Sequence, residues 1–432
     1  MCRPPLGVSY SNIYSVQFWG LRDSWKVFAC DSLAHENTRR EVAPLQAVRM
    51  ALNSSARAHT NLPPSRDEPL PRRRATSMRV AAPAQALVGT ARRAFSTSRP
   101  IIAVVSPRDN PALKSVPKDR ADFLIADNLD TMLGYGPELL GKVEGLLWIP
   151  PGPPPVLSQL WAGGHLPSCQ WVHGFYAGVD GVGEFVRELE SSEVPLTNGR
   201  GAFSASLAEY AITAALHFTK QVPRCMRNHE DKVWDKFEMS MLRGKTLGLV
   251  GYGDIAKATA RLAKAFGMRV VALRRNAGKP DEGGDVDLVL GPYEGEIQPA
   301  HKRALLEQSD VVVCSLPGTA ETRHFLSTEE FGAMKDDAVF ISLGRGVVVD
   351  EAALAATLAA GRLRGAALDV FEVEPLPQSS PLWSSERLLL TAHNADFTDD
   401  YFEQGWRVWA ANLDALQAGR PPVTPVDKRA GY

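Results

Sequence analysis

The stretch GKTLGLVGYGDIAKATARLAKAFGMRVVALRR, residues 244–275, decides how the second half of this chain folds. An apolar run at 246–250 predicts a buried strand, and a turn rich in glycine follows it. A second apolar run at 270–273 predicts another strand. Between the two lies an amphipathic pattern that predicts a helix. Its apolar side comprises Ile255, Ala258, Leu262 and Phe266. This order of elements is that of a βαβ unit in a parallel sheet.

The glycine turn has the spacing Gly-x-Gly-x-x-Ala, formed by Gly251, Gly253 and Ala256. The first glycine permits a tight turn, the second lets the backbone approach a pyrophosphate, and the small third residue lets the helix pack close to the strand. Unpaired amides at the helix N-terminus then favour negative charge. Such a motif between a strand and a helix predicts dinucleotide binding. The predicted contact residues are Gly251, Tyr252, Gly253, Asp254 and Ile255.

Two arginines end the second strand of this unit. In units that bind NAD, an Asp or Glu at this position hydrogen-bonds the adenosine ribose. Here the position falls on Arg274, followed by Arg275. A carboxylate would repel a 2′-phosphate by roughly 4 kcal/mol at 4 Å in an effective dielectric of 20, whereas guanidinium groups attract it. The sequence therefore predicts a preference for NADP(H), with NAD(H) as the alternative and Lys279 as a helper.

Short apolar runs alternate with longer segments in the first half of the chain, which also predicts an α/β fold. The predicted strands are 101–105, 121–126, 145–149 and 171–175. The proline-rich run PPGPPP at 150–155 predicts a rigid loop, because proline lacks an amide donor. The segment 206–224 predicts one long apolar helix that leads out of the first domain.

Composition excludes several other classes of protein. The chain has 432 residues, 44% hydrophobic and 22% charged, which is ordinary globular composition. Its formal net charge of −1 provides no general attraction to nucleic acid or to anionic membranes. The five scattered cysteines form neither a Cys-x-x-Cys pair nor a zinc pattern, so no metal site is predicted. No apolar run approaches the roughly 20 residues of a membrane span.

The first 99 residues have a different composition. Residues 69–107 contain no Asp or Glu, and seven arginines lie between residues 72 and 99. The segment RRAFSTS at 92–98 resembles a mitochondrial processing site. We expect 1–99 to be a transit peptide or disordered leader, with the mitochondrion favoured over the plastid. A gene-model extension that starts translation at Met78 is the alternative, and it would leave the protein cytoplasmic.

Several motifs in one order resemble the D-isomer-specific 2-hydroxyacid dehydrogenases, and among them the NADPH-using glyoxylate and hydroxypyruvate reductases. The resemblance covers essentially all of 101–432. Its marks, besides the glycine turn, are HGFYAGVDG at 173–181, VPLTNGRG at 194–201, SDVVVCSLPGTAETRHFL at 309–326, AVFISLGRGVVVDEAAL at 338–354, GAALDVFEVEPLP at 365–377 and the closing VDKRAGY.

Reduction of a 2-oxo acid requires a cation for its carboxylate and an acid for the developing alkoxide. Arg345, between two glycines, is the candidate cation, and His393, after the run LLLTA, is the candidate acid. We expect His324 and His217 to be structural. FEVEP offers Glu372 and Glu374 as partners that would fix the histidine tautomer, and spacing alone does not choose between them. The resemblance selects Glu374, because the family's glutamate precedes a proline.

The resemblance also implies further contacts. The nicotinamide would be lined by Pro317, Leu343, Asp369, Ala395, Arg345 and His393. The substrate carboxylate would contact Arg345 and the amides of Ala177 and Gly178, in a pocket shaped by Trp148 and Ile149. One departure from the family pattern Thr-Pro-His-Ile is Ala392 with Asn394, which we expect to loosen the histidine loop and alter substrate preference. A second is the acidic stretch 280–298, to which no role is assigned.

These observations predict two doubly wound α/β domains. A flavodoxin-like substrate domain would span 101–221, a Rossmann domain 222–398, and residues 399–432 would return to the substrate domain as a C-terminal helix. The site would lie in the cleft between the two domains. We expect a small 2-oxo or 2-hydroxy acid as ligand, no nucleic acid or membrane partner, and a homodimer. The alternatives are a non-catalytic dinucleotide-sensing scaffold and an NAD-dependent dehydrogenase that works in the oxidative direction.

Overall fold

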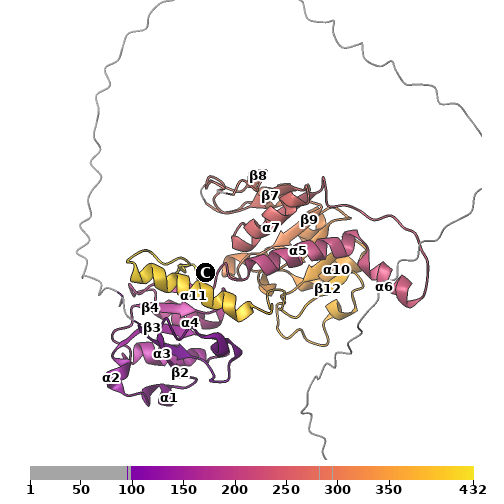
Figure 1. Ribbon diagram of the computed structural model, residues 1–432. Helices are drawn as coiled ribbons and strands as arrows, with labels where there is room; N and C mark the ends of the chain where they lie inside the picture. The colour runs from indigo at the N-terminus through magenta and orange to yellow at the C-terminus, as the bar shows by residue number, and fades with distance from the viewer. Residues whose placement is uncertain (1–94, 96–98, 282, 294) are drawn as a thin grey trace, which may run out of the picture. The chain divides into compact units, whose positions relative to one another are not determined.

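The computed structural model describes residues 95, 99–281, 283–293 and 295–432. Almost all of the leader expected at 1–99 lies outside the described residues, so transit to an organelle stays a prediction. In the described part, two parallel sheets with helices on both faces form the fold (Figure 1). This confirms the predicted α/β class with two doubly wound sheets.

The first sheet has the flavodoxin-like order β2-β1-β3-β4-β5, with every pair parallel. Its strands are β1 (Ile101–Val105), β2 (Asp122–Ala126), β3 (Val143–Trp148), β4 (Trp171–Gly174) and β5 (Leu196–Asn198). The first four coincide with the predicted apolar runs to within two residues. Strands buried on both faces read as continuous apolar runs, which is why the sequence located them.

Helices cover both faces of the first sheet. One face packs against α1 (Leu129–Leu133), α2 (Pro137–Leu140), α3 (Pro154–Ala162) and α4 (Gly183–Glu188). The other face packs against the C-terminal helix α11 (Tyr401–Gln417), through Trp406 and Trp409. Beyond α11, Thr424 and Val426 hydrogen-bond along the β5 edge. The C-terminal helix therefore completes this domain as predicted.

The proline-rich run is only partly a loop. The prediction of a loop throughout 150–155 was wrong at its end, because α3 begins at Pro154. Proline is tolerated in the first turn of a helix, where its missing amide has no intrahelical acceptor.

The second sheet has the order β12-β11-β10-β9-β6-β7-β8 and is parallel throughout. Its strands are β6 (Thr246–Val250), β7 (Arg269–Leu273), β8 (Leu288–Leu290), β9 (Val311–Cys314), β10 (Val339–Ser342), β11 (Gly365–Leu368) and β12 (Leu388–Leu390). The strand order reverses between β6 and β9: β7 and β8 follow on one side of β6, and β9 to β12 on the other. This is the Rossmann arrangement, and ligands bind beyond the strand ends at such a point.

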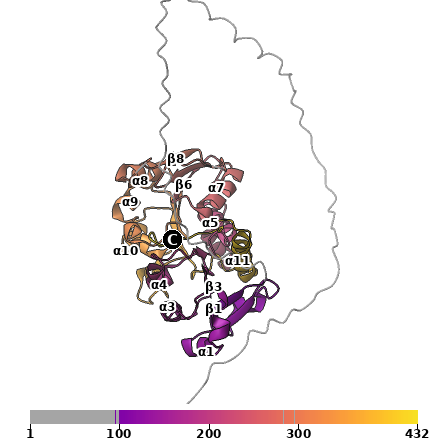
Figure 2. The same ribbon diagram turned by 90° about the vertical axis from the view of Figure 1, so that its left-hand side faces the viewer.

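Figure 2 shows helices on both sides of the second sheet. On one side lie α5 (Ser204–Thr219) and α7 (Asp254–Ala265), and on the other lie α8 (Pro299–Leu306), α9 (Thr328–Ala333) and α10 (Glu351–Ala359). The stretch 280–298, which had no assigned role, contains β8 at the edge of this sheet.

The long helix predicted for 206–224 is two helices. α5 ends at Thr219, and α6 (Val222–Glu230) starts after Gln221, whose φ of 51° lies in the left-handed region. Pro223 stands in the first turn of α6, a position that a continuous helix would not tolerate. The single-helix prediction was wrong because it ran through this proline.

The apolar face predicted for the nucleotide-domain helix is also corrected. The buried residues of α7 are Ala256, Thr259, Ala260 and Ala263, whereas Phe266 is 41% exposed. Ile255 and Leu262 of the predicted face pack, partly buried, against the same core, so the prediction was right for these two residues and missed the small buried ones. Within the described residues, no helix has both the length and the apolar character needed to cross a membrane.

Candidate active site

A cavity of about 610 Å³ gathers loops from the ends of both sheets. From the first domain it is lined by Trp148, Tyr176, Ala177, Gly178, Asn198 and Arg200. From the second it is lined by Gly253, Pro317, Leu343, Arg345, Asp369 and His393. Tyr401, Gly431 and Tyr432 from the C-terminal segment complete it. The predicted cofactor turn and the predicted acid therefore face one cavity.

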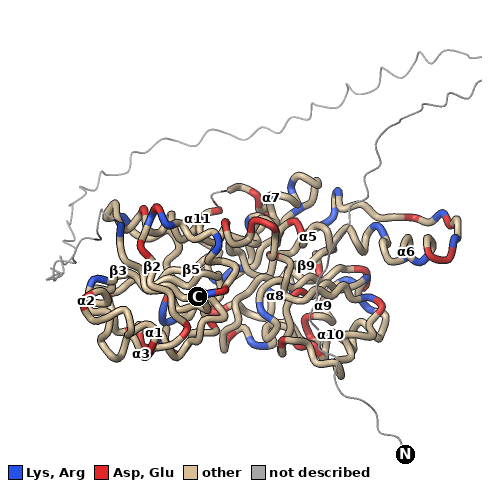
Figure 3. Tube along the Cα trace, turned by 60° about the horizontal axis from the view of Figure 1, so that its bottom comes forward, with Lys and Arg blue, Asp and Glu red and all other residues tan. Residues whose placement is uncertain are grey.

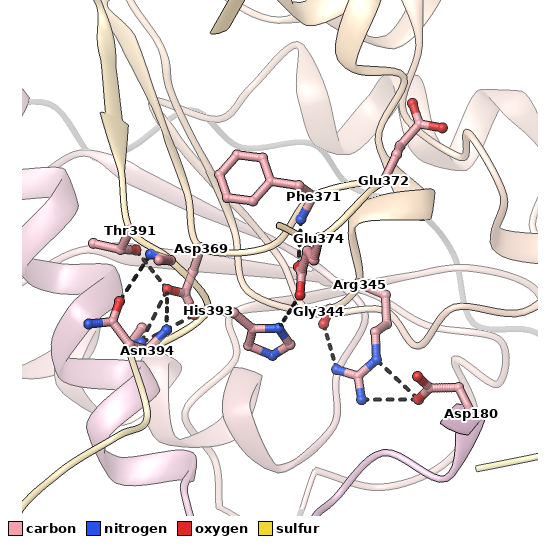
Figure 4. Close-up of polar contacts among 12 residues, drawn as sticks. Asp180, Gly344, Arg345, Asp369, Phe371, Glu372, Glu374, Thr391, His393 and Asn394 are labelled. Atoms are coloured by element: carbon pink, nitrogen blue, oxygen red, sulfur yellow. Dashed lines mark hydrogen bonds and ion pairs between the residues drawn. The ribbon is translucent and has the colours of Figure 1, made fainter. Parts of the chain in front are cut away.

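His393 lies in the loop that follows β12, and its ring Nδ1 is 2.8 Å from Oε2 of Glu374 (Figure 4). The other oxygen of Glu374 accepts a hydrogen bond of 2.9 Å from the amide of Phe371, which fixes the carboxylate. This pairing makes Nδ1 the donor and leaves Nε2 to act on a ligand. Glu372 instead lies 2.9 Å from His324 Nε2. The geometry thus places Glu374, and not Glu372, against His393.

Arg345 projects into the cavity from the turn between β10 and α10. Its Nη1 donates to the Gly344 carbonyl at 2.9 Å, and its Nε and Nη2 each donate to Asp180 Oδ1 at 3.1 Å (Figure 4). A Cβ at Gly178 would lie 1.7 Å from Arg345 Nη2, so any other residue there would require the guanidinium to move from this position. The first domain is therefore shaped to receive the arginine of the second.

Asp369, at the end of β11, holds the histidine loop. Its buried Oδ1 accepts hydrogen bonds from Thr391 Oγ1 at 2.7 Å and from the amides of Asn394 and Ala395 at 3.0 and 3.1 Å. The His393 amide donates to the Asp369 carbonyl at 2.9 Å. These bonds keep His393 at φ 50°, a conformation rare outside glycine.

A hydrogen bond within the histidine loop constrains its backbone at Ala392, the position where the family carries proline. The Ala392 amide, which a proline would lack, donates to Asn394 Oδ1 at 3.1 Å. The side-chain oxygen of Asn394 is thereby occupied within the loop. The two departures from the family pattern form one contact, so the structure does not support the expected loosening at Ala392.

The cofactor end of the cavity begins at the glycine turn after β6. Gly251 has φ 91°, which a residue with a side chain rarely adopts. Gly253 is the N-cap of α7, and no side chain caps this helix start. The first amides of α7 are therefore available to a phosphate. Asp254 lines the cavity and lies 3.4 Å from Arg200 Nε.

Arg274 and Arg275 follow β7, beyond the glycine turn. The Arg274 guanidinium lies 5.9 Å from the centre of the Tyr252 ring, and its buried Nε has no hydrogen-bond partner among the described residues. Arg275 is exposed and lies 5.2 Å from the ring centre of Tyr432. The Tyr252 hydroxyl donates to Asp281 at 3.0 Å. Neither arginine is among the residues that line the cavity.

Most of the predicted contact residues line the cavity, but Gly251, Tyr252, Arg274, Arg275, Ile149 and Ala395 do not. Ile149 is fully buried in the core of the first domain, so the prediction that it shapes the pocket was wrong. Ala395 is not among the lining residues, and its contribution is the amide bond to Asp369.

The histidines expected to be structural lie outside the cavity. His324 pairs with Glu372, and His217 faces Phe218 on α5. Burial lowers the pKa of His217. Burial also lowers the pKa of His173, on β4, to about 3, so its ring is neutral.

The sequence did not identify several lining residues. Asp180 was present in the quoted AGVDG motif, but only the structure shows its bonds to Arg345. Asp396 and Tyr401 follow the histidine loop, and Tyr432 comes from the closing segment. Asp180 and Tyr432 stand in motifs that the sequence analysis quoted, but neither motif indicated a role for these side chains.

A Rossmann sheet with its glycine turn, joined to a histidine–glutamate pair and an arginine in one cavity, defines an NAD(P)-dependent oxidoreductase. Residues 212–395 match the family model described as D-isomer specific 2-hydroxyacid dehydrogenase, NAD binding domain. A glyoxylate reductase of Korarchaeum cryptofilum is 33% identical over 271 residues, which are 61% of this chain and 77% of that protein.

Solved structures agree with this. A D-isomer specific 2-hydroxyacid dehydrogenase from Xanthobacter autotrophicus Py2, in complex with NADPH and MES, is 27% identical, with a TM-score of 0.63 over 78% of this chain and 100% of that one. An NADPH-dependent glyoxylate/hydroxypyruvate reductase from Sinorhizobium meliloti, in complex with NADP and malonate, is 27% identical, with a TM-score of 0.57 over 77% and 98%. The chain belongs to the D-isomer specific 2-hydroxyacid dehydrogenase family. It is an NAD(P)-dependent enzyme that acts on CH–OH donors.

Proposed function

We propose that this protein reduces a small 2-oxo acid, of the glyoxylate or hydroxypyruvate type, to the D-2-hydroxy acid with NADPH. The observation that carries the proposal is the cavity in which the His393–Glu374 pair and Arg345 face the glycine turn that precedes α7. The relatives described as glyoxylate reductases support the substrate class.

His393 is the proposed general acid. With Nδ1 bonded to Glu374, its Nε2 can hold a proton and deliver it to the oxygen of the ketone as negative charge develops there. The carboxylate of Glu374 stabilises the positive ring and keeps its orientation. NADPH, when bound, supplies the hydride.

Arg345 is the proposed anchor for the substrate carboxylate. A guanidinium offers donors in a fork that matches a carboxylate. In this structure two of those donors are bonded to Asp180, which is 60% exposed. The amides of Ala177 and Gly178 lie in the adjacent loop and would provide the remaining contacts. Binding of substrate would then replace or share the Asp180 contact.

The preference for NADP(H) rests on Arg274 and Arg275. They stand where a strand end that binds the ribose of NAD would carry an acid, and the buried Nε of Arg274 has no hydrogen-bond partner among the described residues. The neighbouring acid Asp281 is occupied by the Tyr252 hydroxyl and by the amides of Gly283 and Val286. A 2′-phosphate would thus meet two cations beside an acid that already has partners.

The experiment that tests the proposal is a steady-state assay of the purified full chain. Glyoxylate, hydroxypyruvate, pyruvate and phenylpyruvate are each assayed with NADPH and with NADH, and the product configuration is determined with a stereospecific enzyme. The expected result is the highest kcat/KM for one of the first two acids with NADPH, and a D product where the product is chiral. No turnover of any 2-oxo acid would favour the scaffold alternative, and faster NADH reactions throughout would contradict the cofactor assignment.

We also propose that the protein is a homodimer built through α6 and the segment after it. The described residues of α6 bury no side chain, and Figure 3 shows this helix apart from the other labelled elements. Several large apolar side chains in this region are exposed to solvent. They are Met226, Val233, Trp234, Met239 and Met241, of which Trp234 is fully exposed. Monomeric proteins rarely expose such a cluster, and a second copy of the chain would cover it.

A further inference from the structure

Asp396 lies three residues after His393 and lines the same cavity. It is half-buried, and within the described residues no Lys, Arg or His side chain lies within ion-pair distance of its carboxylate. Its surroundings include Tyr176 and Tyr401, and burial raises its pKa. A carboxylate kept in a partly apolar wall costs free energy unless something hydrogen-bonds to it. Among the described residues its own backbone amide bonds to it but no side chain donates to it, so a further partner is sought in the ligand.

The positions of the other groups limit which part of the ligand can reach Asp396. Arg345 would hold the substrate carboxylate, and His393 would contact the ketone oxygen. Asp396 is within electrostatic reach of both side chains. The remaining substituent of the reacting carbon can therefore point toward Asp396 or toward Trp148. The indole nitrogen of Trp148 is bonded to the Gly152 carbonyl at 2.7 Å, so the Trp148 side chain itself offers only apolar contact.

We propose that Asp396 is a specificity-determining residue that accepts a hydrogen bond from a hydroxyl group on the carbon next to the ketone. The inference rests on the proposed reduction of 2-oxo acids and names the member that the site would prefer. An uncharged donor fits better than an ammonium group, because Arg345 already places a cation beside the substrate. A second carboxylate at the same position would be repelled by Asp396.

The test compares three acids that differ only at that carbon, all assayed with NADPH. Hydroxypyruvate carries a hydroxymethyl group, pyruvate a methyl group and oxaloacetate a carboxymethyl group. The quantity measured is the ratio of kcat/KM to that for pyruvate, because a loss of activity common to both substrates cancels in the ratio. The variants are Asp396→Ala and the near-isosteric Asp396→Asn. Asp399→Asn is the control, since Asp399 is exposed on the same segment and does not line the cavity.

In Asp396→Ala, the hydroxypyruvate-to-pyruvate ratio should fall by about tenfold or more, the size expected for a lost hydrogen bond to a charged group. In both Asp396 variants the oxaloacetate-to-pyruvate ratio should rise, because the repelling charge is gone. The control should keep both wild-type ratios. Melting temperature and NADPH binding show whether each variant is folded, and Asp396→Asn decides the matter if the alanine variant is not.

Ratios that stay at the wild-type values in a folded Asp396 variant would overturn the inference while leaving the reductase assignment intact. A wild-type protein that reduces none of the three acids, nor glyoxylate, would instead overturn the proposed function itself. The two failures are therefore distinguishable in one set of assays.

Discussion

Replacement of Arg274 tests the cofactor assignment most directly. Its guanidinium lies 5.9 Å from the centre of the Tyr252 ring in the glycine turn, and its buried Nε has no hydrogen-bond partner in the part of the chain that the structure describes. We expect Arg274→Ala to lower kcat/KM for NADPH while changing that for NADH much less, because NADH has no 2′-phosphate. The measured quantity is the ratio of the two kcat/KM values with glyoxylate held at saturation.

The structure gives the expected size of this change. A hydrogen bond to a charged group contributes about 1.5–3 kcal/mol, which corresponds to a factor of roughly 10 to 150 in the ratio. Arg275 is exposed, so its contribution should resemble that of a surface ion pair, about 0–1 kcal/mol or at most about fivefold. Arg274→Asp should shift the ratio further than Arg274→Ala, because a carboxylate there repels the phosphate.

A matched control is available on the same strand. Arg269, at the opposite end of β7, bonds to Gln308 and is exposed. Arg269→Ala removes the same charge far along the strand from the glycine turn and should leave the ratio unchanged. If Arg274→Ala leaves the ratio at the wild-type value, or if Arg269→Ala shifts it equally, the 2′-phosphate is not bound at Arg274 and the reasoning fails.

Three further changes have defined outcomes. His393→Ala should reduce kcat by at least about 100-fold in a stopped-flow assay while fluorescence titration still shows NADPH binding, and retained turnover would remove His393 from the acid role. Trp234→Glu should raise the proportion of monomer in sedimentation velocity, since a charge replaces the most exposed apolar side chain, and an unaltered distribution would count against the proposed interface. Asp350 caps α10 by accepting bonds from the Ala353 amide and the Ser327 hydroxyl, which lower its pKa. A lowered pKa adds stability above the unfolded-state value, about 3.9, that is lost as pH falls through the folded value. Asp350→Ala should therefore lower the melting temperature clearly at pH 7 and less below pH 3, with Asp350→Asn retaining part of the cap, and an equal loss at both pH values would contradict this assignment.

The fold was predictable wherever burial leaves a periodic or continuous apolar pattern. Strands such as β1, β3 and β6 are buried on both faces, so their residues must be apolar, and the runs appear directly in the sequence. The break at Gln221 was not predictable from hydrophobicity, because apolar residues continue on both sides of it. The packed face of α7 was predicted only in part, because its fully buried positions are alanines and a threonine.

The residues of the candidate site were predictable where a single short motif indicates the role of its own residue. The glycine turn, Arg345 and His393 each stand in a short motif whose chemistry can be stated locally. Asp180 and Asp396 could not be placed in the same way. Their roles depend on which loop faces them across the cavity, and that is fixed by the packing of separate elements. For the same reason, spacing alone could not choose between Glu372 and Glu374. The folded chain places Glu372 against His324 and Glu374 against His393.

Asp369 contributes both to the expected nicotinamide site and to the position of the histidine loop. Its side chain faces the cavity where the nicotinamide is expected, and the same carboxylate receives the Thr391 hydroxyl and the amides of the histidine loop. Its carbonyl also accepts the His393 amide. A substitution that removes the carboxylate would therefore release the loop that sets the position of His393, even if the cofactor still bound. Because the positive φ of His393 is maintained by these bonds, the orientation of the acid depends on Asp369 as much as on Glu374.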